Sequence, residues 1–142
     1  MTILDAQAVI ALLREEAAAE EVGRLVASPT MLSALNAAEV LDQMVRVFGH
    51  DAADIHADLA RLQRGGLWFA PVTDEVGILA GQLRARHYHR TRRAVSLADC
   101  VAAATALTEK QPLATADPAL VAMVRDQGGQ VHALPDTGGN MP

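Results

Sequence analysis

Four acidic residues in this 142-residue chain occupy positions where carboxylates could act together. They are Asp5, Glu39, Asp99 and Asp117. Two like charges ~4 Å apart repel by about 4 kcal/mol at an effective dielectric of 20, so four carboxylates in one cleft need compensation. A hard divalent cation such as Mg²⁺ or Mn²⁺ provides it, because these ions prefer oxygen ligands and complete their shell with water. A shared cleft would therefore be a metal site.

Each acid also has a simpler interpretation as a helix start. Two resemble the second residue of a capping box and two occupy an N-cap position: Asn36-x-x-Glu39 and Ser96-x-x-Asp99 for the first kind, Asp5 and Asp117 for the second. Pro118 follows Asp117, in the first helical position that proline favours. Taken singly, each acid is explained by capping, and only their joint placement favours chemistry.

The elements that would place these acids alternate along the chain. Apolar stretches predict strands over residues 1–4, 30–35, 67–72, 112–116 and 130–134. Helical patterns occupy residues 6–16, 17–27, 36–48, 53–64, 74–86, 97–110 and 118–127. The alternation predicts an α/β three-layer sandwich, a parallel sheet of about five strands covered by helices on both faces. Ligands bind such sheets beyond the carboxyl ends of the strands, where the acids would meet.

Length and composition are those of one globular domain, which we expect over residues 1–135, followed by a disordered tail over 136–142. Hydrophobic residues make up 51% of the chain, yet no apolar run approaches the ~20 residues of a membrane span. With a single cysteine and no signal-peptide pattern, we expect a cytoplasmic protein without membrane contact.

Basic residues gather in one stretch of an otherwise acidic chain. The net charge is −5, which argues against a generally basic coat for nucleic acid. Five arginines nevertheless fall between residues 84 and 93: Arg84, Arg86, Arg90, Arg92 and Arg93. We expect them to contact a phosphate backbone or an acidic protein segment, the alternative being a solvated surface.

The order of the acidic segments resembles that of a PIN domain, specifically a VapC-type toxin of a toxin–antitoxin pair. The segments that carry the resemblance are ILDAQAVIALL, SALNAAEVLDQ, SLADCVAAATA and LATAD. It extends from Ile3 to about Leu134 and implies a PIN-like fold and a Mg²⁺- or Mn²⁺-dependent endoribonuclease. It further implies homodimers and inhibition by a VapB-like antitoxin.

The same resemblance assigns roles within the sequence. The four acids would be the catalytic and metal-site residues, with Thr115 and Asn36 as polar support. The family usually has serine or threonine two residues after the first acid, and this chain has Gln7. An amide reaches further than a hydroxyl but can still bond a metal-bound water, so the substitution affects the fine geometry of the site.

Two other functions remain open. Asp5 could be a nucleophile for phosphoryl transfer, but that chemistry usually places a second acid two residues later, where Gln7 stands. The chain could instead be a non-catalytic PIN-like binding domain whose acids are only caps.

Several further residues are predicted to be structural. Trp68 and Phe69 should belong to the core, with base stacking as the alternative, and Cys100 should be a buried apolar residue. His87 and His89 have no further histidine or cysteine nearby to complete a zinc set. Apolar residues of the first two helices could leave a groove for an antitoxin helix: Leu12, Leu13, Val22, Leu25 and Val26.

Overall fold

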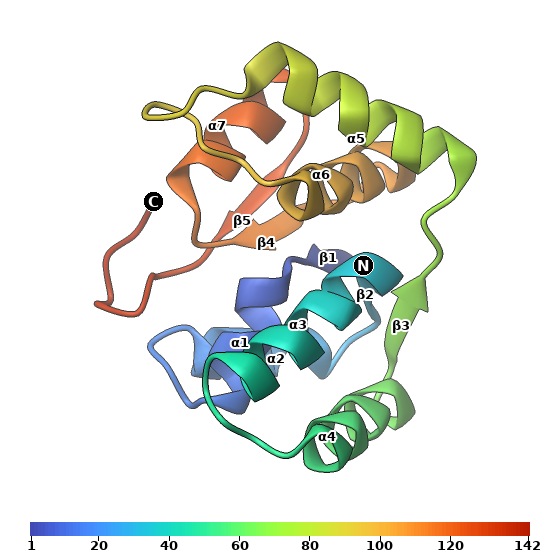
Figure 1. The fold of residues 1–142 in the computed structure, drawn as a ribbon, viewed down its shortest axis with the longest axis vertical. Helices are drawn as coiled ribbons and strands as arrows, with labels where there is room; N and C mark the ends of the chain where they lie inside the picture. The colour runs from blue at the N-terminus through green and yellow to red at the C-terminus, as the bar shows by residue number, and fades with distance from the viewer.

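The computed structural model describes all 142 residues as alternating strands and helices (Figure 1). The strands are β1 (Thr2–Leu4), β2 (Thr30–Ser33), β3 (Leu67–Ala70), β4 (Leu113–Thr115) and β5 (Val131–Ala133). The helices are α1 (Ala6–Leu13), α2 (Ala19–Val26), α3 (Ala34–Arg46), α4 (Ala52–Arg64), α5 (Asp74–His87), α6 (Leu97–Glu109) and α7 (Pro118–Asp126). None of these helices is both long and apolar enough to cross a bilayer.

The five strands form one sheet in the order β3-β2-β1-β4-β5, and every neighbouring pair is parallel. Chain order therefore reverses at β1, which pairs with β2 on one side and with β4 on the other. The strands are short and apolar because both faces of the sheet are covered. This arrangement confirms the predicted parallel α/β sandwich.

Two helical layers enclose the sheet (Figure 1). One core joins Ile3, Met31 and Leu113 to the apolar faces of α5, α6 and α7. The other joins Leu4, Leu32 and neighbouring strand residues to α1, α2, α3 and α4. Side chains that alternate along β1 thus enter opposite cores, as strand geometry requires. Helix α6 is the most deeply buried, with every residue from Cys100 to Ala106 inside.

Several details differ from the sequence predictions. The first helix ends at Leu13 rather than at residue 16, and the third strand ends at Ala70 rather than at residue 72. The second strand ends at Ser33 rather than at residue 35, because the Ser33 hydroxyl accepts the amide of Asn36 and begins α3 two residues early. Asn36 is consequently not an N-cap. Trp68 is not a core residue but is 57% exposed, since β3 is an edge strand, while Phe69 packs against the core.

The chain after β5 crosses back beside α1 and ends in a turn. Asp136 Oδ1 accepts the amides of Gly138 and Asn140, both at 2.9 Å. Residues 136–142 contain no helix or strand, and their predicted disorder in solution stays a prediction.

The surroundings of two glycines predict substitution effects on stability of opposite sign, one at Gly129 in the turn between α7 and β5 and one at Gly77 in α5. A Cβ at Gly129 would lie 2.7 Å from Val124 Cγ1 and 2.8 Å from Leu107 Cδ2, so Gly129→Ala should destabilise the protein by about 1–3 kcal/mol. Gly77 is exposed within α5 with nothing near its Cβ position, so Gly77→Ala should stabilise by up to about 1 kcal/mol. Urea unfolding measures both, and equal effects would contradict the packing at Gly129.

Candidate functional site

Two of the four acids flank the point where strand order reverses. Asp5 directly follows β1 and Asp117 lies two residues after β4, and these strands are paired neighbours. Each acid begins the next helix: Asp5 Oδ1 accepts the Ala8 amide at 2.7 Å, and Asp117 Oδ1 accepts the Ala119 amide at 2.8 Å. The capping interpretation is therefore correct, and the same geometry brings both carboxylates to the sheet edge where ligands bind.

The other two acids approach this edge from helices on opposite faces. Asp99 lies in the first turn of α6, where its Oδ2 accepts the Ser96 amide at 2.7 Å in a complete capping box. Glu39 lies in α3, which follows β2. Asp5 experiences the charges of Asp99 and Asp117, and Glu39 experiences that of Asp99. The four carboxylates therefore share one electrostatic environment.

Burial makes Asp5 unlike an ordinary cap. It is 4% exposed, whereas Asp51, the N-cap of α4, is exposed. The pKa of Asp5 is raised from 3.8 to about 7, mainly because burial disfavours the charged form. Hydrogen bonds from Thr115 and Ala8 oppose this shift, and the charges of Asp99 and Asp117 add to it. Because the folded protein disfavours the ionised form of Asp5, burial of this carboxyl lowers the free energy of unfolding at neutral pH. Helix capping alone does not require that loss of stability.

Burial also raises the pKa values of Asp99 and Glu39. Hydrogen bonds with Ser96 oppose the shift at Asp99, and the Asn36 amide opposes it at Glu39. A second carboxylate adds to the shift in each case, Asp117 for Asp99 and Asp99 for Glu39. Three members of the set are therefore harder to ionise than free carboxyls.

A chain of amide side chains holds Glu39. Asn36 is 1% exposed, and its Nδ2 donates to Glu39 Oε2 at 3.3 Å and to the Ala98 carbonyl oxygen at 3.2 Å. Gln43 Nε2 donates to Glu39 Oε1 at 3.3 Å, and Gln7 Nε2 donates to Gln43 Oε1 at 3.0 Å. Asn36 thus contacts Glu39 directly, whereas Gln7 is connected to Glu39 through Gln43 of α3. The supporting roles of Asn36 and Gln7 stay predictions.

Gln43 is the one polar residue of this network that was not predicted from the sequence. The signal was available, because Glu39 and Gln43 are four residues apart and therefore neighbours on one face of a helix. Thr115 is fully buried, its hydroxyl accepts the Asp117 amide at 3.1 Å, and it bonds Asp5, so it lies between these two acids.

The donor chemistry of the set fits a hard divalent cation. All four side chains offer oxygen only, and none forms an ion pair with a lysine, arginine or histidine. As oriented, however, no three of them are grouped closely enough to enclose an ion. The three aspartates each accept a backbone N–H through one oxygen, whereas Glu39 accepts the side-chain amides of Asn36 and Gln43.

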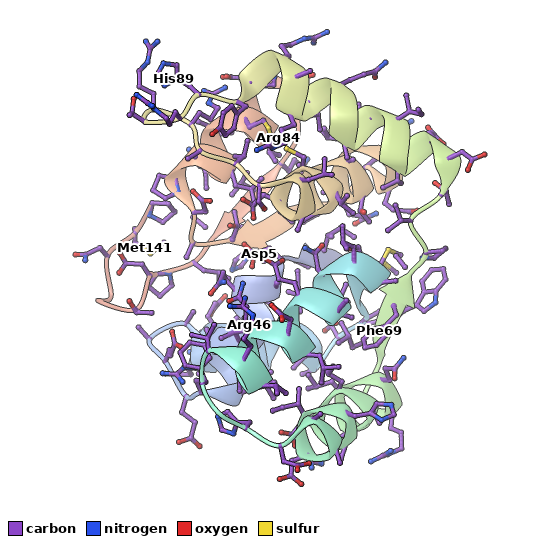
Figure 2. All side chains as sticks on the ribbon, viewed as in Figure 1. Asp5, Arg46, Phe69, Arg84, His89 and Met141 are labelled. Atoms are coloured by element: carbon purple, nitrogen blue, oxygen red, sulfur yellow. The ribbon has the colours of Figure 1, made fainter.

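The arginine stretch divides into structural and free residues. Arg93 Nη1 donates to Asp126 Oδ2 at 2.9 Å, and Arg84 bonds the Val95 carbonyl oxygen and stacks on Tyr88. Arg86, Arg90 and Arg92 are exposed and form no ion pair. Figure 2 shows His89, in the loop that carries Arg90 and Arg92, well away from Asp5. This loop is therefore not part of the acidic cluster.

Cys100 and the two histidines have structural surroundings. Cys100 is fully buried, as predicted, and burial raises the pKa of its thiol to about 11. His87 bonds Gln127 and Arg93, and burial lowers its pKa. His89 Nδ1 accepts the amides of its own loop.

The raised pKa of Asp5 predicts that the metal-free protein loses stability as the pH rises from about 4 to about 7. The unfolded chain ionises Asp5 near 3.8, whereas the folded protein keeps the proton to about 7, so the folded state binds more protons across this window and rising pH favours unfolding. Asp5→Asn preserves the cap without ionising and should flatten much of the fall; Asp99 and Glu39 account for the rest.

Urea unfolding in EDTA at several pH values measures this effect. Asp51→Asn is the matched control, because Asp51 caps α4 through the Ala53 amide at 2.8 Å but is exposed. That variant should keep the parental pH dependence. Identical slopes for Asp5→Asn and the parent would show that Asp5 ionises like a free carboxyl.

Known proteins share this fold and its sequence pattern. The family model of the PIN domain matches residues 2–125. Among solved structures, Mycobacterium tuberculosis VapC20, a sarcin-ricin loop cleaving toxin, is 22% identical, with a TM-score of 0.69 over 86% of this chain and 94% of its own. VapBC2 of Rickettsia felis, bound to a promoter DNA fragment, is 15% identical, with a TM-score of 0.68 over 92% and 96%.

A toxin–antitoxin complex of Klebsiella pneumoniae is 17% identical, with a TM-score of 0.64 over 86% of this chain and 91% of its own. No curated protein sequence matches the chain. At these identities the structural likeness is one of fold, whereas the family model extends through β1, β4 and the segments that carry all four acids. This chain belongs to the PIN domain family.

Proposed function

We propose that the protein is a metal-dependent endoribonuclease that hydrolyses RNA phosphodiester bonds in the cytoplasm as the toxin of a VapBC-type pair. The observation that carries the proposal is the set of four carboxylates without cationic partners at the strand-order reversal of a PIN domain. Isolated caps would be exposed and independent of one another. These acids are partly or fully buried, and the pKa values of Asp5, Glu39 and Asp99 are raised by burial and by the charge of at least one other acid of the set.

In this proposal Asp5, Asp99, Asp117 and Glu39 hold Mg²⁺ or Mn²⁺, which supplies charge for the attacking and leaving oxygens of the phosphodiester. Asp5 is central, because it is the most buried of the acids and is reached by the Thr115 hydroxyl. The Asn36 and Gln43 amides orient Glu39, so that its carboxylate keeps one position in the cleft.

Helix ends add to the attraction of this edge for phosphate. Helices α1 and α7 begin at Asp5 and Asp117, and Asp99 lies in the first turn of α6. The partial positive charge of each of these helix N-termini favours an anion nearby. No side chain is needed as a nucleophile, which agrees with the absence of a second acid at Gln7. Phosphoryl transfer through Asp5 is consequently disfavoured.

The proposed partners are RNA, a cognate VapB-like antitoxin and a second copy of the chain. Support for an antitoxin comes from the fold shared with chains of toxin–antitoxin complexes. The groove residues expected between the first two helices, Leu12, Leu13, Leu25 and Val26, are partly buried against the core, and Val22 is fully buried. A docked antitoxin helix would therefore rest on the outer edges of these side chains.

Removing one carboxylate should abolish RNA cleavage while the fold persists. Asp99→Asn keeps the helix start but removes a metal ligand, so the purified variant should lose activity that the parent shows with Mn²⁺. Mn²⁺ at a hundredfold excess over Kd should also stabilise the parent by about 2.7 kcal/mol, and the variant much less. Product analysis on a mixed-sequence RNA and melting curves in EDTA and Mn²⁺ provide the two measurements.

Asp51→Asn again serves as the control and should cleave like the parent. Expression of the parent alone should arrest growth of a bacterial host, and Asp99→Asn should relieve the arrest. Cleavage that continues in excess EDTA, or in the Asp99→Asn variant, would refute the metal-dependent mechanism. Normal growth with abundant parent protein would argue against the toxin role.

The free arginines should bind RNA away from the cleavage point. Changing Arg86, Arg90 and Arg92 to Gln should weaken RNA binding. The slope of log binding constant against log salt concentration should become shallower by roughly 0.7 for each phosphate that is no longer neutralised. Arg64→Gln, a change at an exposed residue of α4, is the matched control. Arg93→Gln should instead lower stability, because it breaks the pair with Asp126. Filter binding at several salt concentrations measures the slopes, with Asp99→Asn present in every protein so that the RNA is not cleaved. Unchanged slopes would mean that these arginines belong to the solvated surface.

A further inference from the structure

A cavity of about 220 Å³ lies immediately beside the acidic cluster. Its apolar wall consists of small or aliphatic groups, among them Ala8 and Ala11 of α1, Ala116 after β4, and Leu134 after β5. Pro135 and Thr137 of the C-terminal segment form another side. The chain after β5 thus closes a cavity whose other walls come from α1 and from the segment after β4.

The cavity and the cluster share residues. Asp117 lines the cavity and also affects the pKa values of Asp5 and Asp99. Ala8, in the apolar wall, donates its amide to Asp5 Oδ1. Gln7 stands at the cavity and connects through Gln43 to Glu39. A group bound in the cavity would therefore lie next to a phosphate bound at the acids.

The polar lining excludes a phosphate from the cavity itself. Its charged members are Glu16, Asp117 and Asp136, and no lysine or arginine lines it. Carboxylates accept hydrogen bonds and donate none when ionised. Arg14 pairs with Glu16 at 2.8 Å from outside the lining. The hollow suits a neutral, flat, largely apolar group that presents N–H donors.

The volume of the cavity limits the size of the ligand that it can hold. Pockets for drug-sized ligands measure roughly 300–1,000 Å³, so this smaller cavity suits one ring system rather than a whole nucleotide. No aromatic residue lines it, which means that contact with aliphatic groups and edge hydrogen bonds must hold the ring, without stacking. Adenine, cytosine and guanine carry an exocyclic amino group with two donor hydrogens. Uracil has only one N–H donor on its pairing edge, and the carbonyl oxygens on both sides of it would be repelled by the carboxylates.

We propose that this cavity binds the RNA base adjacent to the cleaved phosphodiester and favours bases with an exocyclic amino group over uracil. The proposal rests on the ribonuclease function above and makes the cavity a determinant of cleavage sequence. Gln7, the residue at which this chain departs from the family pattern, stands between the base site and the acids and contributes its amide to the boundary.

Cleavage of a randomised RNA pool, followed by sequencing of the product ends, tests the proposal. The parent should deplete uracil about five- to tenfold at one position next to the cut. Ala11→Leu fills the cavity and should reduce that depletion below about twofold while total cleavage of the pool stays within a few-fold. Deletion of residues 136–142 removes Asp136 and Thr137 from the outer side without altering the core, and should also relax the preference. Ala57→Leu, on the exposed face of α4, is the matched control and should change neither.

A second measurement uses one short RNA cut by the parent. Replacing the base at the selected position with its analogue that lacks the amino group (purine for adenine, hypoxanthine for guanine, pyrimidin-2-one for cytosine) should slow cleavage by the parent and leave Ala11→Leu unaffected. A parent that cleaves all bases equally, or a preference that survives both variants, would overturn the base site while the ribonuclease function stands, and would direct attention to a protein side chain as the occupant. A parent that cleaves no RNA would overturn both.

Discussion

Uncompensated negative charge at one edge of the sheet is the constraint around which this protein is organised. Asp5 is 4% exposed at the end of the central strand, and no basic side chain pairs with it or with the other acids. Burial of a carboxylate without a cation is costly, and it shifts the pKa of Asp5 to about 7. The fold accepts this cost at one place only, where a bound cation would remove it.

Helix capping and ligand binding are compatible in this site because a carboxylate has two oxygens. Asp5, Asp99 and Asp117 each use one oxygen for a backbone amide at the start of a helix. The cap fixes the position of the side chain, so the remaining oxygen points from a rigid element. A site built from caps therefore gains orientation from backbone hydrogen bonds, and needs a supporting network only at Glu39, where two amides provide it.

Recognition surfaces are separated from this centre by their chemistry. No lysine or arginine lines the cavity or pairs with the four acids, whereas Arg90 and Arg92 occupy a loop away from Asp5 (Figure 2). In the proposed function, phosphates far from the cut would meet the arginines, the scissile phosphate would meet the acids through a cation, and a base would meet the cavity. Such a division allows the backbone contacts to hold RNA while the cavity discriminates among sequences.

Local patterns in the sequence determined the elements, the layers and the four acids, because hydrophobic period and capping residues are readable within a few neighbours. Capping strength is harder to rank locally, so the sequence predicts the start of α3 at Asn36 rather than at Ala34, which follows the Ser33 cap. Only the tertiary structure decided which residues share an environment. The sheet order makes Asp5 and Asp117 neighbours, leaves Trp68 exposed on an edge strand and lets the chain end close the cavity beside α1. Burial, pKa and cavity shape depend on contacts between distant segments, and no pattern confined to a few neighbouring residues encodes such contacts.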